Sequence, residues 1–262
     1  DFGSNVKKLQ RYLRRQAPLA KPIDKVAYFV DLYAAYNDHE LGKAVVDVLR
    51  HNQVEVIVPP QVGVGMPAIS YGDLPYARQA MDYNIRHLAE AVRRGYKVIC
   101  SEPTAALCLK EEYLDIAEGP EYHLVAENTW ELTGFLADLA KQGKLRTDLK
   151  PQKMKLAYHK PCHYEALKIG DATLDLMRMI EGVEIEMLPN SCCGIAGTFG
   201  FQKKNFDLSM QAGQPMLEPL RASTADFGLT ECSTCKMQME LAAGKKVLHP
   251  VKILAQAYGL SD

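Results

Sequence analysis

The chain has 262 residues with 31 basic and 32 acidic side chains, so its formal net charge is -1. Hydrophobic residues make up 47% of it and charged residues 24%, which is typical of a folded globular protein and excludes a disordered chain. Without an excess of positive charge, nucleic acid is not expected as a partner, and no run of about 18 apolar residues predicts a membrane span.

The first 24 residues are basic, and Val6, Leu9 and Leu13 recur at helical spacing, so residues 1–24 are predicted to be an N-terminal helical segment. From Lys25 onward, short apolar runs alternate with longer amphipathic stretches. Strands are predicted at Val26–Val30, Val54–Val58 and Lys97–Cys100, and helices at His39–His51 and Tyr76–Arg94. This alternation is typical of βαβ units that form a parallel sheet.

The same order of elements then recurs about 130 residues later. Lys155–Tyr158 matches Lys25–Tyr28, Thr173–Arg178 matches Val45–Arg50, and Val183–Ile185 matches Val54–Val56. Gly194 falls on Gly65, and Thr230-Glu231 on Ser101-Glu102. The fold class predicted from this repeat is α/β, with two tandem pseudo-symmetric domains over residues 25–150 and 151–262, joined by a helix and a polar turn.

Seven cysteines are the unusual feature of the composition, and five of them share one pattern. Cys162, Cys192, Cys193, Cys232 and Cys235 follow three predicted strands of the second repeat, where loops at the carboxyl ends of parallel strands converge. The equivalent positions of the first repeat are Leu32, Gly63, Val64 and the 103–106 turn, none of which is cysteine. We therefore expect one thiolate-rich site, in the second domain.

Several interpretations of these cysteines are open on spacing alone. Thiolates are soft ligands that suit iron–sulfur clusters, zinc or Cu(I), and the C-x-x-C pair is also typical of redox sites. A structural zinc site takes four ligands, one fewer than the five thiols available. Accidental core cysteines are a further alternative, which we favour for Cys100 and Cys108. A secreted disulfide scaffold would be shorter and denser in cysteine, so a cytoplasmic protein is expected.

The motifs Tyr158–His163, Cys192–Phe201, Cys232–Lys236 and His249-Pro250 together resemble the cysteine-rich CCG domain family, which contains the catalytic (B- and D-type) components of heterodisulfide reductase. Within it, the chain is most similar to the C-terminal half of the anaerobic glycerol-3-phosphate dehydrogenase C subunits and to the iron–sulfur subunits of lactate and glycolate oxidases. The ferredoxin-like module that usually precedes this part in such proteins is absent, which suggests a truncated chain or a separate polypeptide.

The resemblance implies a noncubane-type [4Fe-4S] cluster held by Cys162, Cys192, Cys193, Cys232 and Cys235. Zinc, which the residue types leave open, is the alternative cofactor. Gly194 is expected beside the cluster, because a residue without a side chain lets the backbone approach a bulky group. His159 and His163 flank Cys162, where each would donate to the cluster, move a proton, or simply cap the loop.

The function implied is that of an electron-transfer subunit in a larger oxidoreductase. Its expected partners are a flavoprotein dehydrogenase subunit, a ferredoxin-like iron–sulfur module or subunit, and a membrane quinone, membrane subunit or other carrier, with peripheral attachment to the inner membrane face through those partners. The alternatives are a cluster-based reductase of a disulfide substrate and a zinc-stabilised assembly module.

Overall fold

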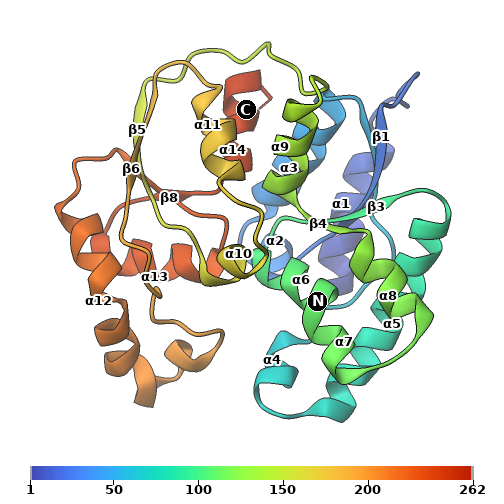
Figure 1. Cartoon of the computed structure of the whole chain (residues 1–262), viewed down its shortest axis with the longest axis horizontal. Coiled ribbons are helices and arrows are strands. Elements are labelled where there is room, and N and C mark those ends of the chain that lie inside the picture. The colour runs from blue at the N-terminus through green and yellow to red at the C-terminus, as the bar shows by residue number, and fades with distance from the viewer. Residues whose placement is uncertain (1, 261–262) are drawn as a thin grey trace.

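Two four-stranded parallel sheets form the framework of the molecule in the computed structural model (Figure 1). The structure describes residues 2–260. Residue 1 of the predicted segment 1–24 and residues 261–262 of the predicted domain 151–262 therefore lie outside the described residues. The strand orders are β2-β1-β3-β4 and β6-β5-β7-β8, the same arrangement twice. The predicted α/β class with two pseudo-symmetric parallel sheets is confirmed.

The first sheet consists of β1 (Asp24–Phe29), β2 (Val54–Ile57), β3 (Lys97–Cys100) and β4 (Thr129–Glu131). Its central strand is apolar because both faces are covered: Val26, Tyr28 and Phe29 are fully buried. The helices of this half are α2 (Leu32–Tyr36), α3 (His39–His51), α4 (Met66–Ser70), α5 (Leu74–Arg93), α6 (Pro103–Leu107), α7 (Tyr113–Ile116), α8 (Pro120–Glu127) and α9 (Leu132–Lys141), with a π-turn at Cys108–Glu112. We call residues 24–141 the first half.

The second sheet consists of β5 (Met154–Tyr158), β6 (Val183–Met187), β7 (Phe227–Leu229) and β8 (Val247–Leu248). Its register repeats that of the first sheet, since Leu156 pairs with both Ile185 and Phe227, as Val26 pairs with Val56 and Lys97. The helices here are α10 (Cys162–Ala166), α11 (Ala172–Arg178), α12 (Phe206–Ala222), α13 (Ser233–Ala243) and α14 (Pro250–Tyr258), with 3₁₀ turns at Phe199–Phe201 and Lys203–Asn205. We call residues 154–258 the second half.

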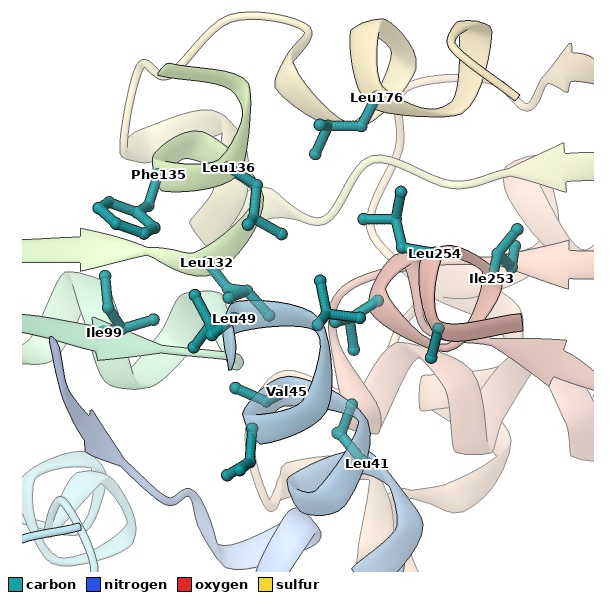
Figure 2. Close-up of a cluster of buried hydrophobic side chains, with 14 of the residues drawn as sticks. Leu41, Val45, Leu49, Ile99, Leu132, Phe135, Leu136, Leu176, Ile253 and Leu254 are labelled. Carbon is teal, nitrogen blue, oxygen red and sulfur yellow. The ribbon is translucent and has the colours of Figure 1, made fainter. Parts of the chain in front are cut away.

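Four helices between the two sheets join the halves into one core. Helix α9 contacts α11, and α3 contacts α14, so each pair combines one helix from either half (Figure 1). Figure 2 shows their side chains converging, with Leu49 of α3, Leu136 of α9 and Leu254 of α14 among them. Since these residues belong to one buried cluster, the two halves are expected to be stabilised together.

The N-terminal helix α1 (Phe2–Arg14) packs on the first half through Val6 and Leu9, as the helical spacing predicts. It ends before Pro18, in agreement with the break expected there. Two strands were not predicted. Trp130, expected in the helix that joins the halves, lies instead in β4, and β8 precedes the final helix. Among residues 2–260, no helix is both long and apolar enough to cross a membrane.

Candidate functional site

All five cysteines of the pattern line one cavity of about 410 Å³. Cys162 starts α10 after β5, Cys192 and Cys193 lie in the loop after β6, and Cys232 and Cys235 flank the start of α13 after β7. The convergence follows from topology, because β6, β5 and β7 are neighbours and parallel, so their carboxyl ends lie at one edge. The sequence predicted this meeting of three distant loops. The ligand roles of the cysteines stay a prediction.

The opposite wall of the cavity comes from the first half. Leu32 of α2, Val64 and Met66 around the start of α4, and Glu102 and Thr104 at the start of α6 all face it. Leu32 and Val64 are two of the positions that the repeat aligns with cysteines. The first half therefore meets the cysteines of the second half with largely apolar side chains rather than with sulfur.

Exposure divides the five thiols into two groups. Cys193, Cys232 and Cys235 are buried, whereas Cys162 and Cys192 are exposed. The cavity is therefore walled by protein around three sulfurs and accessible to solvent beside the other two. A ligand held here would be mostly desolvated yet within reach of a second molecule.

Hydrogen bonds favour negative charge on the sulfurs of Cys193 and Cys232, and they raise the pKa of the donating thiols Cys192 and Cys235. The N–H of Gly194 donates to Sγ of Cys192 at 3.3 Å, and the Thr234 hydroxyl lies 3.1 Å from Sγ of Cys232. Hydrogen bonds from Cys192 and Cys235 lower the pKa of Cys193, and one from Cys235 lowers the pKa of Cys232 to about 7. Because the thiolate is the form that binds metal, the pocket already favours ligand forms at two positions.

The two remaining cysteines are inside the first half. Cys100 lies in β3 and Cys108 in the π-turn, and both are completely buried. Burial, with nearby carboxylates, raises the pKa of both thiols. They are therefore inert thiols of the core, which is the interpretation favoured from sequence.

The two histidines beside Cys162 have different surroundings. His163 lines the cavity, and its Nδ1 lies 2.7 Å from the hydroxyl of Thr104, across the boundary between the halves. His159 is 1% exposed, and neither of its ring nitrogens has a hydrogen-bond partner within the described part of the chain. Burial lowers the pKa of both, so both are neutral near pH 7. Their proposed roles at a cofactor stay predictions.

Gly194 has a packing role that the sequence did not indicate. Its φ is +94°, and a Cβ added there would lie 2.0 Å from the carbonyl oxygen of Ser209 in α12. The glycine thus lets the cysteine loop lie directly against α12. Gly197, three residues on, faces the cavity itself. Whether Gly194 also contacts a cofactor stays a prediction.

Sequence reasoning missed the contribution of Glu102 and Thr104. The repeat aligned Glu102 with Glu231, but it gave no signal that the side chain would reach the other half. The Glu102 carboxylate is 5% exposed and accepts the backbone N–H of Ser233 at 2.9 Å. That contact depends on how the two halves pack, which no local pattern encodes.

The donors at this site are thiols that surround a volume. A backbone N–H donates to one of the sulfurs, and the buried, unpartnered imidazole of His159 lies near Cys193. Soft donors around such a volume match the chemistry of an iron–sulfur group.

Comparison with known proteins defines the class. Residues 156–240 match the family described as "CCG: Cysteine-rich domain". The chain is 30% identical over 244 residues to lactate utilization protein A of Geobacillus kaustophilus, covering 88% of this chain and 98% of that protein. The chain therefore belongs to the family of CCG cysteine-rich proteins.

Two further relatives are parts of larger enzymes by name. The anaerobic glycerol-3-phosphate dehydrogenase C subunit of Escherichia coli is 35% identical over 240 residues, which are 89% of this chain and 59% of that relative. The CoM/CoB fumarate reductase B subunit of Methanothermobacter marburgensis is 29% identical over 241 residues, 89% of this chain and 45% of that relative. The chain thus spans 59% of the first of these relatives and less than half of the second.

Proposed function

We propose that this chain is an electron-transfer subunit of a larger oxidoreductase and that it holds one noncubane-type [4Fe-4S] cluster. The observation that carries the proposal is the meeting of five thiols from three loops around one cavity. Residues 151–262 then form an intact CCG domain, and residues 25–150 a degenerate one without ligands. The relatives that are named as subunits of a dehydrogenase and a reductase support a role within a complex.

Cys162, Cys192, Cys193, Cys232 and Cys235 would hold the cluster, which supplies one-electron transfer when bound. The protein's own contribution is to place the sulfurs and to favour their negative charge. The N–H of Gly194 and the hydroxyl of Thr234 act on sulfur directly. Cys193, Cys232 and Cys235 are buried among apolar side chains of the second half, and the exposed side at Cys162 and Cys192 is the route to a partner.

The expected partners are a flavoprotein dehydrogenase subunit and a ferredoxin-like iron–sulfur module as donors, with a quinone, membrane subunit or other carrier as acceptor. We place this function in the cytoplasm, with membrane contact made through partners. These assignments rest on the family and on the named relatives, and co-purification with a flavoprotein tests them.

The deciding experiment is metal analysis of the full chain purified anaerobically together with any partners it retains. We expect iron and acid-labile sulfide in near-equal amounts, no zinc, and an electron paramagnetic resonance (EPR) signal that appears or disappears on changing the redox state. Stoichiometric zinc without sulfide would overturn the proposal and support a zinc-stabilised assembly module instead.

Reduction of a disulfide substrate is a second candidate, favoured by the accessible, largely apolar cavity beside the thiols. A volume of about 410 Å³ is within the range of small-molecule sites. The relative named for CoM/CoB supports the same idea. Adding a thiol to the oxidised protein tests it: a new EPR signal supports a substrate sulfur at the cluster, and an unchanged spectrum counts against it.

A further inference from the structure

One carboxylate crosses from the first half to the turn that carries Cys232 and Cys235. Glu102 follows β3, and its Oε2 accepts the backbone N–H of Ser233 at 2.9 Å. Ser233 is the first residue of α13 and lies between the two cysteines, at the end of the helix where negative charge is favoured. Glu102 also lines the cavity, so it touches both the cysteine turn and the space that the thiols face.

The internal repeat provides a comparison for Glu102, because the equivalent glutamate of the second half makes its hydrogen bonds within its own half. Glu231 occupies the equivalent place in the second half, directly before Cys232. Its Oε1 accepts the hydroxyl of Tyr158 at 2.9 Å and is also bonded by the hydroxyl of Thr173. In its own half, therefore, Glu231 has two hydroxyl donors and stays within the core.

The first half does not offer Glu102 these donors. The equivalent of Thr173 is Val45, which has no hydroxyl. The equivalent of Tyr158 is Tyr28, and its hydroxyl is bonded to Ser101 at 2.7 Å instead. Within the first half only the hydroxyl of Thr104 approaches the carboxyl, at 3.5 Å from Oε1. A buried carboxyl group needs closer donors, and the N–H of Ser233 across the boundary supplies one to Oε2 at 2.9 Å.

We propose that Glu102 is a positioning residue for the cysteine site: it fixes the start of α13 so that Cys232 and Cys235 face the cavity. That these two thiols are cluster ligands rests on the proposed function. The hydrogen bond itself does not, and it gives the half without cysteines a definite part in the site. The first half then serves as the template on which the C-x-x-C turn of the second half is held.

Thiol reactivity in the chelator-treated full chain tests this directly. Iodoacetamide with mass spectrometry measures the rate at each cysteine, with exposed Cys162 as the internal standard. We expect Glu102→Ala to raise alkylation of Cys232 and Cys235 by about tenfold relative to Cys162, the upper end of the effect of losing one buried hydrogen bond. Glu102→Gln keeps an oxygen acceptor and should restore the slow rate.

Two further variants make the test specific. Asp38→Ala removes another first-half carboxylate that contacts α13, through Lys236 at 3.3 Å, and should leave the rate at Cys232 unchanged because the Ser233 N–H keeps its acceptor. Ser233→Pro removes the donor instead. Proline is favoured at a first helical position, and Cys232 already has the extended backbone that proline requires before it. Ser233→Pro should raise the alkylation rate at Cys232 and Cys235 as much as Glu102→Ala does. The double variant should be alkylated no faster than either single variant.

The outcomes separate the two proposals. Equal rates at Cys232 in the wild type, Glu102→Ala and Ser233→Pro would overturn the positioning role, as would an increase of the same size in Asp38→Ala. If the wild type as isolated contains no iron and sulfide, the proposed function fails while the alkylation result still stands. Where a cluster is present, Glu102→Ala should lower its content or shift its EPR signal, and Glu102→Gln should restore both.

Discussion

The two halves share a framework and differ in what they place at its edge. In both parallel sheets the second strand of the half lies at the edge, followed by the first, third and fourth strands. Both halves also have a tyrosine on the first strand and a glutamate just after the third strand. The second half adds five thiols at the strand ends, whereas the first has Leu32, Gly63 and Val64 in the matching loops. The comparison shows that the fold does not depend on the cysteines.

A further difference concerns the direction in which the shared groups act. Glu231 binds hydroxyl groups of its own half, but Glu102 binds the backbone of the other. Thr104 likewise contacts His163 across the boundary. A half without cysteines at the equivalent positions can therefore still shape the site of its neighbour, through residues that a motif search does not select.

The largest effect is expected from removing thiols, because the thiols are what distinguishes the second half from the first. Cys193→Ala and Cys235→Ala should each reduce bound iron and sulfide to background, since both thiols are buried in the cavity wall and, among the described residues, no cysteine beyond the five lines the cavity to take the place of the lost one. Cys108→Ala, in the first half, is the matched control and should keep full loading. Full iron content in either site variant would refute the ligand assignment.

The helices and strands of the two halves could be predicted from the sequence to different degrees. Helix α3 has the predicted bounds His39–His51 because apolar residues recur on one face and Asp38 caps its start. Strands β4 and β8 are three and two residues long, too short to show a period, so neither was predicted. Helix α12 contains Pro215 and Pro219, which argue locally against a helix that tertiary packing nevertheless stabilises.

At the site, the convergence of the cysteines could be predicted because it follows from residue type and from their spacing after the strands. The wall opposite them was not, because Glu102 and Val64 are ordinary residues whose position depends on how the two sheets pack through α3, α9, α11 and α14. Sequence therefore indicated where a ligand could be bound, and the structure shows what surrounds that place.

The shared core gives the next prediction. Leu254 of α14 is fully buried against helices of the first half, so Leu254→Ala should lower the free energy of unfolding by about 2–5 kcal/mol. Trp130, the single tryptophan, lies in β4 and packs beside Phe135 of α9, so its fluorescence reports on the surroundings of the first-half sheet. Tryptophan fluorescence and far-UV circular dichroism should shift by the same amount in a denaturant titration.

Leu241→Ala on α13 is the control, since that side chain is 63% exposed and its loss should change stability by less than about 0.5 kcal/mol. Different midpoints for fluorescence and circular dichroism in Leu254→Ala would mean that the halves unfold separately, contrary to a common core.

A pair of equivalent glycines sharpens the comparison further. Gly65 and Gly194 both have positive φ, +83° and +94°, so alanine is strained at either. A Cβ at Gly65 would have its nearest neighbour 3.7 Å away, but at Gly194 it would lie 2.0 Å from the carbonyl oxygen of Ser209. Gly194→Ala should therefore cost about 1–3 kcal/mol more than Gly65→Ala in thermal or denaturant unfolding. Equal costs would show that the cysteine loop moves freely away from α12.

The smallest effect expected is a pH dependence at Glu131, whose charge also raises the pKa of Glu231 in the second half. Glu131 at the end of β4 is fully buried, and burial raises its pKa from 4.5 to about 7, although the N–H of Gly134 and the hydroxyl of Thr133 partly oppose the shift. Below pH 4.5 this side chain is protonated in both the folded and the unfolded chain. Between pH 4.5 and 7 the unfolded chain loses the proton first, so the favourable contribution of the neutral acid is lost as the pH rises through about 7.

Glu131→Gln keeps an oxygen acceptor for Gly134 and does not ionise. Relative to the wild type, its free energy of unfolding should therefore be higher at pH 8 than at pH 5, by on the order of 1–2 kcal/mol. Glu127→Gln, on the exposed side of α8, is the control and should show a flat difference over the same range. If the Glu131→Gln difference is equally flat, Glu131 is ionised in the folded chain near neutral pH, and the core between the halves tolerates a charge that its burial argues against.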